Sequence, residues 1–510
     1  MEKCMRRTFV FITGVILVGL ISFQSLLALA AEKPLVVAID KDFATLDATL
    51  IRIRPDMIAD MLIYDALFYR NPETFKPEPN LVKQLKQVDP TTWDIDLRQG
   101  VIFHDGSEMT AEDVVFSMER ILDPEVKAPY RGSFSWIKSV SASGRYAIRL
   151  TTHRPFGLIS QMLTFMYILP KRHLEKVGPE TFAIQPVGSG PYKVVKWERG
   201  NKLVLTANEN WWKGAPPIKD VVIRVIPETS TRIAELLTGG VHIAWRVPAD
   251  QIGLIKDSKV AHISAQPILR VDFLVLDGDG RGGKTPLADV RVRRAIQHAI
   301  NVEEIISHVL KGYGERVNAG LNRLHFGCNP SIPPVRYDPD KAKQLLREAG
   351  YPADYKLRFN TYNTVPDTVS EAVRVYLEAV GIRVDRKHFA DTSAFVRTRN
   401  SGQLNGMFEL SWGSQSVFDA DQIFWPLLRS DEKFTYNTSP QIDAWLEEAR
   451  YSINQENRAK LYSQVQRYIL ENAWWVPMYA RYSILGVSNK VSYKASGDEL
   501  IRIFDAKWIE

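Results

Sequence analysis

The fold is decided by the stretch Leu97-Arg-Gln-Gly-Val-Ile-Phe-His-Asp-Gly-Ser-Glu-Met-Thr-Ala-Glu-Asp-Val-Val-Phe-Ser117, in which a strand, a tight turn and a helix follow one another. Residues 93–97 alternate apolar and polar side chains as a strand does. Asp105-Gly106 is typical of a turn. Thr110 and Asp113 have the spacing of a capping box, which predicts a helix that ends at Asp123-Pro124.

Working outward, strand and helix patterns alternate in the second half of the chain. Strands are expected at 357–360, 382–385 and 407–410, and helices around 370–380 and 444–448. Between 192 and 245, extended runs follow one another more closely. This pattern predicts the α/β class, with a sheet-rich part before an alternating one.

The length and charge of the chain narrow its function. A chain of 510 residues is too long for a single core, so two or three lobes are expected. The formal net charge is +6, and removing Glu2, Lys3, Arg6 and Arg7 with the N-terminal segment leaves +4. That excess is too small and too evenly spread to indicate a nucleic-acid partner.

The first thirty residues have the pattern of an export signal. Lys3, Arg6 and Arg7 precede an apolar run, and Ala28-Leu29-Ala30 is a small-x-small cleavage site. A membrane anchor is the alternative. Cys4 precedes the apolar run, so it cannot carry a lipid at the cleavage site, and Cys328 alone cannot form an internal disulfide. We therefore expect a soluble, periplasmic protein without a lipid anchor.

A polar loop follows the short apolar run 407–410. Its sequence is Phe408-Glu-Leu-Ser-Trp-Gly-Ser-Gln-Ser-Val-Phe-Asp-Ala-Asp421. Loops that leave the carboxyl ends of strands are where open α/β sheets bind their ligands. We expect this loop to form the floor of a binding cleft, although an ordinary solvated loop has the same composition.

Several long motifs resemble the family 5 solute-binding proteins of ABC importers, the peptide- and nickel-binding type. They are the opening stretch, Pro186-Val-Gly-Ser-Gly-Pro-Tyr-Lys193, Asn208-Glu-Asn-Trp-Trp-Lys-Gly214, Pro286-Leu-Ala-Asp-Val-Arg-Val-Arg-Arg-Ala-Ile296 and Tyr337-Asp-Pro-Asp-Lys-Ala-Lys-Gln-Leu-Leu-Arg-Glu-Ala-Gly350. Such motifs in this order are far more specific than any one alone.

The resemblance implies a two-lobed periplasmic binding protein, type II-like and of cluster C. After the signal peptide 1–30, lobe I would comprise 31–45, 184–269 and 477–510, with an inserted subdomain at 46–183, and lobe II would span 270–476. Two crossings, near 271–276 and 477–484, would form the hinge. The protein would be a monomer that captures a peptide or peptide-like solute and delivers it to a permease in the inner membrane.

The resemblance also implies candidate ligand-binding residues. In peptide-binding relatives a Trp-Gly at this place lines the cleft, which Trp412 and Gly413 match, and an acid in the following loop pairs with the peptide's α-ammonium group. Here Ser414, Gln415 and Ser416 are neutral, and acids return only at Asp419 and Asp421. Either Asp419 takes that role from a shifted loop, or the ligand has no free amine there.

Other candidates come from the residues themselves. Arg246 follows an extended run, and its guanidinium could hold a carboxylate or phosphate in two parallel hydrogen bonds. Trp245 could be a cleft wall or part of a core, and Arg399 and Arg397 are weaker candidates. An anionic solute such as an opine or a sugar phosphate therefore stays an alternative ligand, and a periplasmic chaperone or signalling receptor an alternative function.

The sequence motifs that could indicate nucleotide binding, metal binding or catalysis are weak. Gly278-Asp-Gly-Arg-Gly-Gly-Lys-Thr285 fits a phosphate loop, but Pro286 follows at once and an exported protein meets little nucleotide. No pair of His residues has metal-ligand spacing and no Gly-x-Ser-x-Gly elbow exists. We expect no catalytic residue, no cofactor and no bound metal.

Overall fold

The computed structural model describes residues 33–51, 53–413 and 417–509. The expected signal peptide and two candidate site residues, Ser414 and Gln415, lie outside these ranges. Within them, no helix is both long and apolar enough to cross a membrane.

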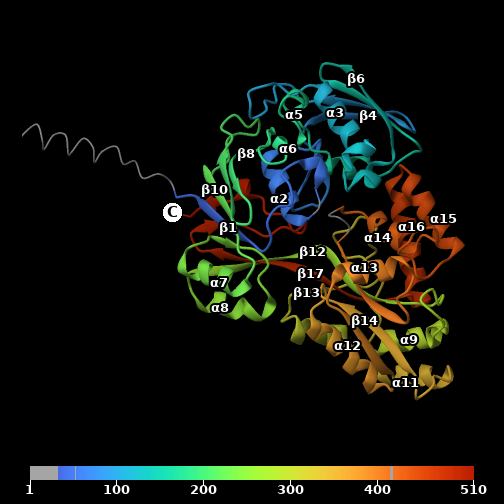
Figure 1. Cartoon of the computed structure of the whole chain (residues 1–510). Coiled ribbons are helices and arrows are strands. Elements are labelled where there is room, and N and C mark those ends of the chain that lie inside the picture. Colours follow the sequence, from blue (N-terminus) through green and yellow to red (C-terminus); the bar gives the residue numbers. More distant parts are fainter. Residues whose placement is uncertain (1–32, 52, 414–416, 510) are drawn as a thin grey trace, which may run out of the picture.

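One mixed sheet of eleven strands runs through both halves of the molecule (Figure 1). Its order is β15, β14, β16, β12, β17, β11, β1, β10, β9 and β8, and β13 pairs with β17. The strands are β1 (Leu35–Ile39), β8 (Tyr192–Glu198), β9 (Lys202–Ala207), β10 (Asp220–Val225), β11 (Ile243–Ala244), β12 (Ala261–Leu276), β13 (Gly314–Arg316), β14 (Lys356–Tyr362), β15 (Arg383–Phe389), β16 (Met407–Trp412) and β17 (Trp475–Ser488).

The long strands β12 and β17 connect the two halves. Residues 261–267 of β12 pair with 482–488 of β17, and residues 271–275 pair with 475–480, with register shifts between Pro267 and Val271 and between Asp272 and Phe273. Shifts of this kind bend and twist a strand pair. The shifts lie at or next to the expected hinge crossings, and Figure 1 shows both strands between the part with α7 and α8 and the part with α9 and α12.

Lobe II, as we name residues 270–476, is an α/β layer structure. The parallel strands β14, β15 and β16 alternate with helices, as the sequence predicts. The helices are α9 (Val290–Ala299), α10 (Val302–Glu304), α11 (Pro339–Glu348), α12 (Asp367–Ala379), α13 (Thr392–Asn400), α14 (Asp421–Leu428), α15 (Pro440–Tyr451) and α16 (Gln455–Glu471). Asp338 caps α11 by accepting the Lys341 backbone N–H.

The inserted subdomain has its own core and a four-stranded antiparallel sheet. The sheet order is β4 (Val82–Asp89), β5 (Thr92–Leu97), β7 (Ala147–Thr152) and β6 (Ile137–Gly144). Helix α3 (Ala111–Leu122) begins at the Thr110–Asp113 capping box, as expected. Smaller elements are β2 (Phe68–Arg70), β3 (Pro77–Pro79), α4 (Ile159–Met162), α5 (Lys171–Val177) and α6 (Pro179–Phe182).

Lobe I surrounds β1 and the strands next to it. Its helices are α2 (Arg54–Ile63), α7 (Thr229–Thr238) and α8 (Ile252–Asp257), and β18 (Val491–Ser492) pairs with β19 (Lys507–Trp508). Buried residues of α2, together with Leu169 and Phe182, pack into the lobe I core, whereas the separate core of the subdomain is formed by residues between Leu67 and Ile168, together with Val417. The boundary of the inserted subdomain stays a prediction, and this packing favours a narrower one than 46–183.

Candidate functional site

The ends of three strands meet at a polar floor between the lobes. Asp40 follows β1, Arg246 follows shortly after β11, and Gly413 follows β16. Ser411 and Glu409 belong to β16, which pairs with β12 through Val271 and Trp412. Ligands of open α/β folds commonly bind outside such strand ends.

Buried polar atoms of this floor lack a hydrogen-bond partner among the described residues. They are Asp40 Oδ1, Asp272 Oδ1, Glu409 Oε2, Ser411 Oγ and Arg481 Nη2. Buried polar groups are nearly always satisfied by protein, water or ligand, so these atoms require ordered water or a ligand as their partner. Arg481 Nε itself donates to Asp272 Oδ2 at 2.6 Å.

Glu409 shows how strongly this floor is withdrawn from water. Burial raises the pKa of Glu409 to about 8, although the Ser370 hydroxyl donates to its Oε1 at 2.5 Å and lowers it in part. A buried carboxyl without a close cation is favoured in its neutral form. The floor therefore carries less negative charge near neutral pH than its acids suggest.

Three guanidinium groups surround one carboxylate beside the floor. Arg270 Nε lies 3.5 Å, Arg54 Nη2 3.8 Å and Arg246 Nη2 3.9 Å from the Glu499 carboxylate. Arg246 also donates to Asp40 Oδ2 at 3.0 Å. We call Arg54, Arg246, Arg270 and Glu499 the arginine cluster.

The cluster also explains the state of Glu499. Burial alone raises the pKa of this carboxyl, but the charges of Arg270, Arg54 and Arg246 outweigh burial and hold it below its usual value. Glu499 is therefore ionised, and it lies between lobe I and the Gly413 end of β16: a Cβ on Gly413 would lie 2.9 Å from Arg270 Nη2.

Trp412 borders a cavity of about 610 Å³ between the inserted subdomain and lobe II. Aromatic rings line it from both sides, among them Trp136, Phe156, Trp412, Trp425, Phe434 and Tyr451. The Trp412 indole N–H donates to the Gln422 carbonyl at 2.7 Å, which fixes the ring and leaves its faces for contact. Trp412 thus lines this cavity, and its expected contact with a ligand stays a prediction.

Arg399 lies close to Trp412. Its guanidinium is 4.6 Å from the Phe434 ring and 5.9 Å from the Trp412 ring, and it donates to Asn400 Oδ1. The side chain is buried, with 6% of the residue exposed, and burial lowers its pKa. Arg399 therefore supports the aromatic wall from behind, whereas Arg397 is 72% exposed and pairs with Asp391.

The segment Val417–Asp419, which we call the closing segment, joins lobe II to the opposite side. Val417 belongs to the core of the inserted subdomain. The Phe418 ring stacks on Phe75 at 4.8 Å, and the Arg70 guanidinium lies 5.2 Å from it. These contacts bury apolar surface between the lobes without any ligand group.

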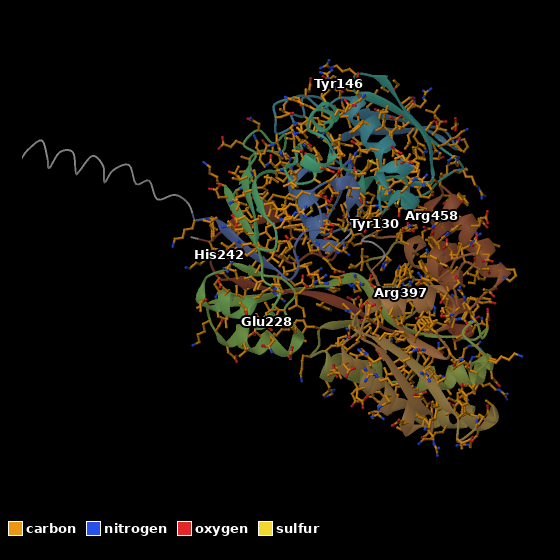
Figure 2. All side chains as sticks on the ribbon, in the orientation of Figure 1. Tyr130, Tyr146, Glu228, His242, Arg397 and Arg458 are labelled. Carbon is orange, nitrogen blue, oxygen red and sulfur yellow. The ribbon has the colours of Figure 1, made fainter. Side chains whose placement is uncertain are left out.

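Asp419 departs from the role suggested for it. Both its oxygens accept hydrogen bonds from Arg458 Nη2 at 2.9 Å, and each side chain is 1% exposed. Burial raises the pKa of Asp419, and the charge of Arg458 opposes that shift. Arg458, labelled in Figure 2, lies where α16 meets the inserted subdomain. A carboxylate so enclosed is not available to an ammonium group, so Asp419 serves the fold in this conformation.

Trp245 also belongs to the fold. It is 1% exposed and packs into the lobe I core, which resolves the choice between cleft wall and core. Its ring does support the site, because the Arg246 guanidinium lies 4.1 Å from its centroid. Arg246 itself is 43% exposed and has a left-handed backbone with φ of 55°, so its placement next to the floor is costly and specific.

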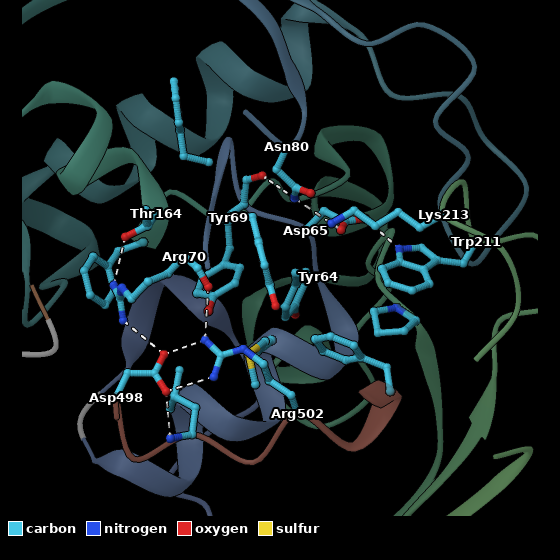
Figure 3. Close-up of a pocket in the computed structure, with 18 residues that line it drawn as sticks. Tyr64, Asp65, Tyr69, Arg70, Asn80, Thr164, Trp211, Lys213, Asp498 and Arg502 are labelled. Carbon is cyan, nitrogen blue, oxygen red and sulfur yellow. Dashed lines mark hydrogen bonds and ion pairs between the residues drawn. The ribbon is translucent and has the colours of Figure 1, made fainter. Parts of the chain in front are cut away.

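A second cavity, of about 50 Å³, lies between lobe I and the inserted subdomain (Figure 3). Arg502 donates to both oxygens of Asp498, and Arg70 lies 3.5 Å from the same carboxylate. The charges of the labelled side chains are thus largely paired with one another. The ion pairs that line this small cavity hold the C-terminal segment in place. The cavity itself is too small for an organic solute.

The remaining motifs carry no site. The phosphate-loop pattern directs the backbone N–H groups of Arg281 and Gly282 at the carboxylate of Asp277, so the loop satisfies its own amides. Among the described residues no group of three or more His, Cys, Asp or Glu could hold a metal ion.

Sequence reasoning missed Arg54, Arg270, Arg458 and Glu499. Arg270 could have been suspected, because it begins the crossing strand at the expected lobe boundary. Glu499 is far from the other cluster members in sequence, and only the tertiary structure brings it to them.

The comparisons with known proteins agree with this architecture. The model of the bacterial extracellular solute-binding proteins, family 5, matches residues 76–435, which is more than half of the chain. The chain belongs to this family. Its members are two-lobed periplasmic binding proteins of ABC importers and not enzymes, so the expected fold class and the general function are confirmed.

Similar proteins differ in the ligand that their names state. Heme-binding protein A of Haemophilus influenzae is 29% identical over 425 residues, covering 76% of each chain. The glutathione-binding protein GsiB of Escherichia coli K12 is 24% identical over 480 residues, covering 91% of this chain and 92% of its own. The Helicobacter pylori periplasmic binding protein DppA, solved with the peptide STSA, is 27% identical with a TM-score of 0.78, covering 94% and 98%.

Proposed function

We propose that this protein captures a peptide or peptide-like solute between its two lobes and delivers it to an ABC permease. The observation that carries the proposal is the set of buried polar atoms on and beside the crossing strands that have no hydrogen-bond partner among the described residues, in a member of a solute-binding family. Such atoms suit a ligand rich in backbone N–H and carbonyl groups, directly or through ordered water. The similarity to DppA with its bound peptide supports this ligand class.

Binding and release would depend on the angle between the lobes. β12 and β17 bend at their register shifts, while lobe II meets the subdomain through the closing segment and through Arg154, which pairs with Glu447 at 2.7 Å. A ligand shifts this equilibrium only if it binds the closed form better. The closed form then presents the surface that the permease recognises.

The cellular location of the protein follows from the same proposal. Family 5 binding proteins are periplasmic. We infer that residues 1–30 are the export signal that brings this chain there, and that it acts as a monomer, with Trp412, Gly413, Ser414, Gln415 and Arg246 around its ligand.

The proposal is tested by native mass spectrometry of protein purified from the periplasm, followed by denaturation and identification of the released molecules. We expect a set of short peptides in the folded sample and none after unfolding and refolding in clean buffer. Release of heme or of one discrete non-peptide solute contradicts the peptide proposal.

A second candidate is a non-peptide anionic solute. Two observations favour it: Asp419 is enclosed by Arg458, so it offers no acid to a ligand ammonium, and Arg246 stands beside the floor with 43% of its side chain exposed. The same experiment separates the two candidates, because an opine or a sugar phosphate has a single mass.

A further inference from the structure

The arginine cluster is built around Glu499, a residue held in an unusual position. Glu499 has a left-handed backbone with φ of 64° and is 8% exposed. Three arginines from separate parts of the chain approach it: Arg54 at the start of α2, Arg246 after β11, and Arg270 in β12. A strained, buried acid that draws in cations from three elements is a feature of a functional site rather than of simple packing.

The contacts to Glu499 are loose. Arg270 and Arg246 lie 3.5 and 3.9 Å from its carboxylate, whereas charge-assisted hydrogen bonds are usually about 2.7–2.9 Å long. The Arg458–Asp419 pair in the same protein reaches 2.9 Å. Glu499 therefore positions the guanidinium groups by charge without occupying their N–H donors in short hydrogen bonds.

Both guanidinium groups are partly exposed to solvent. Arg270 places its terminal nitrogens beside Gly413, where a Cβ would lie 2.9 Å from Nη2, and 25% of its side chain is exposed. The Arg246 guanidinium lies 4.1 Å from the centroid of the Trp245 ring, and 43% of its side chain is exposed. Their planar donor groups match the planar acceptor of a carboxylate.

We propose that Arg246 and Arg270 bind a carboxylate of the transported solute, with Glu499 and Trp245 as the residues that position them. The inference rests on the proposed function and sharpens it, because it makes a free carboxylate, such as the C-terminus of a peptide, the group that the site requires. Gly413, which has no side chain, leaves the space beside the Arg270 guanidinium open to that carboxylate.

The test compares two pools of random tetrapeptides, one with free C-termini and one with C-terminal amides, by native mass spectrometry. We expect the wild-type protein to bind the free-acid pool at least tenfold better. Arg270→Met and Arg246→Met should bind both pools alike, because only the carboxylate contact is lost. The exposed Arg323, paired with Glu315 at 3.0 Å, gives the matched control Arg323→Met, which should keep the preference.

The outcomes separate the two proposals. Equal binding of both pools by the wild type leaves the peptide proposal standing and overturns the carboxylate site. If neither pool binds, the peptide proposal fails. The carboxylate site is then tested by thermal unfolding in three buffers of equal ionic strength, which contain sodium acetate, acetamide with sodium chloride, or sodium phosphate. We expect acetate alone to raise the Tm, and to do so in Arg323→Met but not in Arg246→Met. The same Tm in all three buffers, or a higher Tm in phosphate alone, contradicts the carboxylate site.

Discussion

The closing segment and the arginine cluster bring the lobes together in opposite ways. In the closing segment each charged group has a full partner: Asp419 meets Arg458 at 2.9 Å, and Phe418 is enclosed between Phe75 and the Arg70 guanidinium. In the cluster three arginines share Glu499 at 3.5–3.9 Å, and Arg246 remains 43% exposed.

The difference separates stability from recognition. A buried pair with matched charge is costly to break but offers nothing to a ligand. Partly exposed cations add little to folding through their ion pairs, even where one contact is short, as between Arg246 and Asp40 at 3.0 Å, and they can make further contacts when an anion arrives. We infer that the closing segment supports the closed form and that the arginine cluster selects what closes it.

The largest expected effect is the loss of the matched pair. Asp419→Ala leaves the Arg458 guanidinium buried without a carboxylate, and breaking such a pair costs about 3–5 kcal/mol. Urea denaturation should show this loss of unfolding free energy. Replacing both partners in Asp419→Leu/Arg458→Met should restore part of it. A change below about 1 kcal/mol in the single variant contradicts a structural role for Asp419.

Next comes the aromatic contact across the lobes. Phe418→Ala removes a ring that is 1% exposed, and truncation of a buried Phe costs about 3 kcal/mol or more. Because Phe75 belongs to the other side of the cleft, part of this cost should appear as opening of the lobes. Small-angle X-ray scattering of the ligand-free variant should give a larger radius of gyration than the wild type. Val375→Ala, at an exposed position on α12, is the control and should leave the radius unchanged.

Local rules predict the scaffold well but not the site. The capping box at Thr110, the cap at Asp338 and the strand before Trp412 depend on neighbouring residues, so the sequence determines them. Asp419 shows the limit: its position after Trp-Gly suggested a ligand contact, yet its partner Arg458 lies 39 residues away on α16. Nothing near Asp419 in sequence indicates that pairing.

The arginine cluster shows the same limit more strongly. Arg246 could be suspected from the strand before it, but Glu499, which holds it, comes from the C-terminal segment. The strain at both residues, with φ of 55° and 64°, is likewise invisible in sequence because neither is a glycine. Functional placement arises here from the meeting of distant segments.

A smaller effect comes from Glu409, a buried acid on which the charges of Arg386 and Arg481 act too weakly to offset burial. Its pKa is about 8 in the folded protein and about 4.3 in an unfolded chain, so between these values the folded state holds the extra proton. Stability should therefore fall as pH rises, by about 2 kcal/mol between pH 6 and pH 8. Glu409→Gln cannot ionise and can still accept from Ser370, so its unfolding free energy should change less over this window. Equal pH profiles for both proteins would mean that Glu409 is ionised when folded.

The smallest expected effect is that of a substitution in the arginine cluster. Arg246→Gln should change the unfolding free energy by less than about 1 kcal/mol, because the Arg246 side chain is 43% exposed and solvent screens its pairing with Asp40, whose side chain is 19% exposed. The Glu499 carboxylate keeps Arg270 and Arg54 nearby, so it is not left buried alone. Thermal unfolding of Arg246→Gln and of Asp419→Ala under the same conditions compares the two variants directly. If Arg246→Gln proves as destabilising as Asp419→Ala, the cluster is a structural ion-pair network and its arginines are committed to the fold. If it is nearly neutral, Arg246 is free to serve the ligand, and the strain in its backbone is kept for binding rather than for stability.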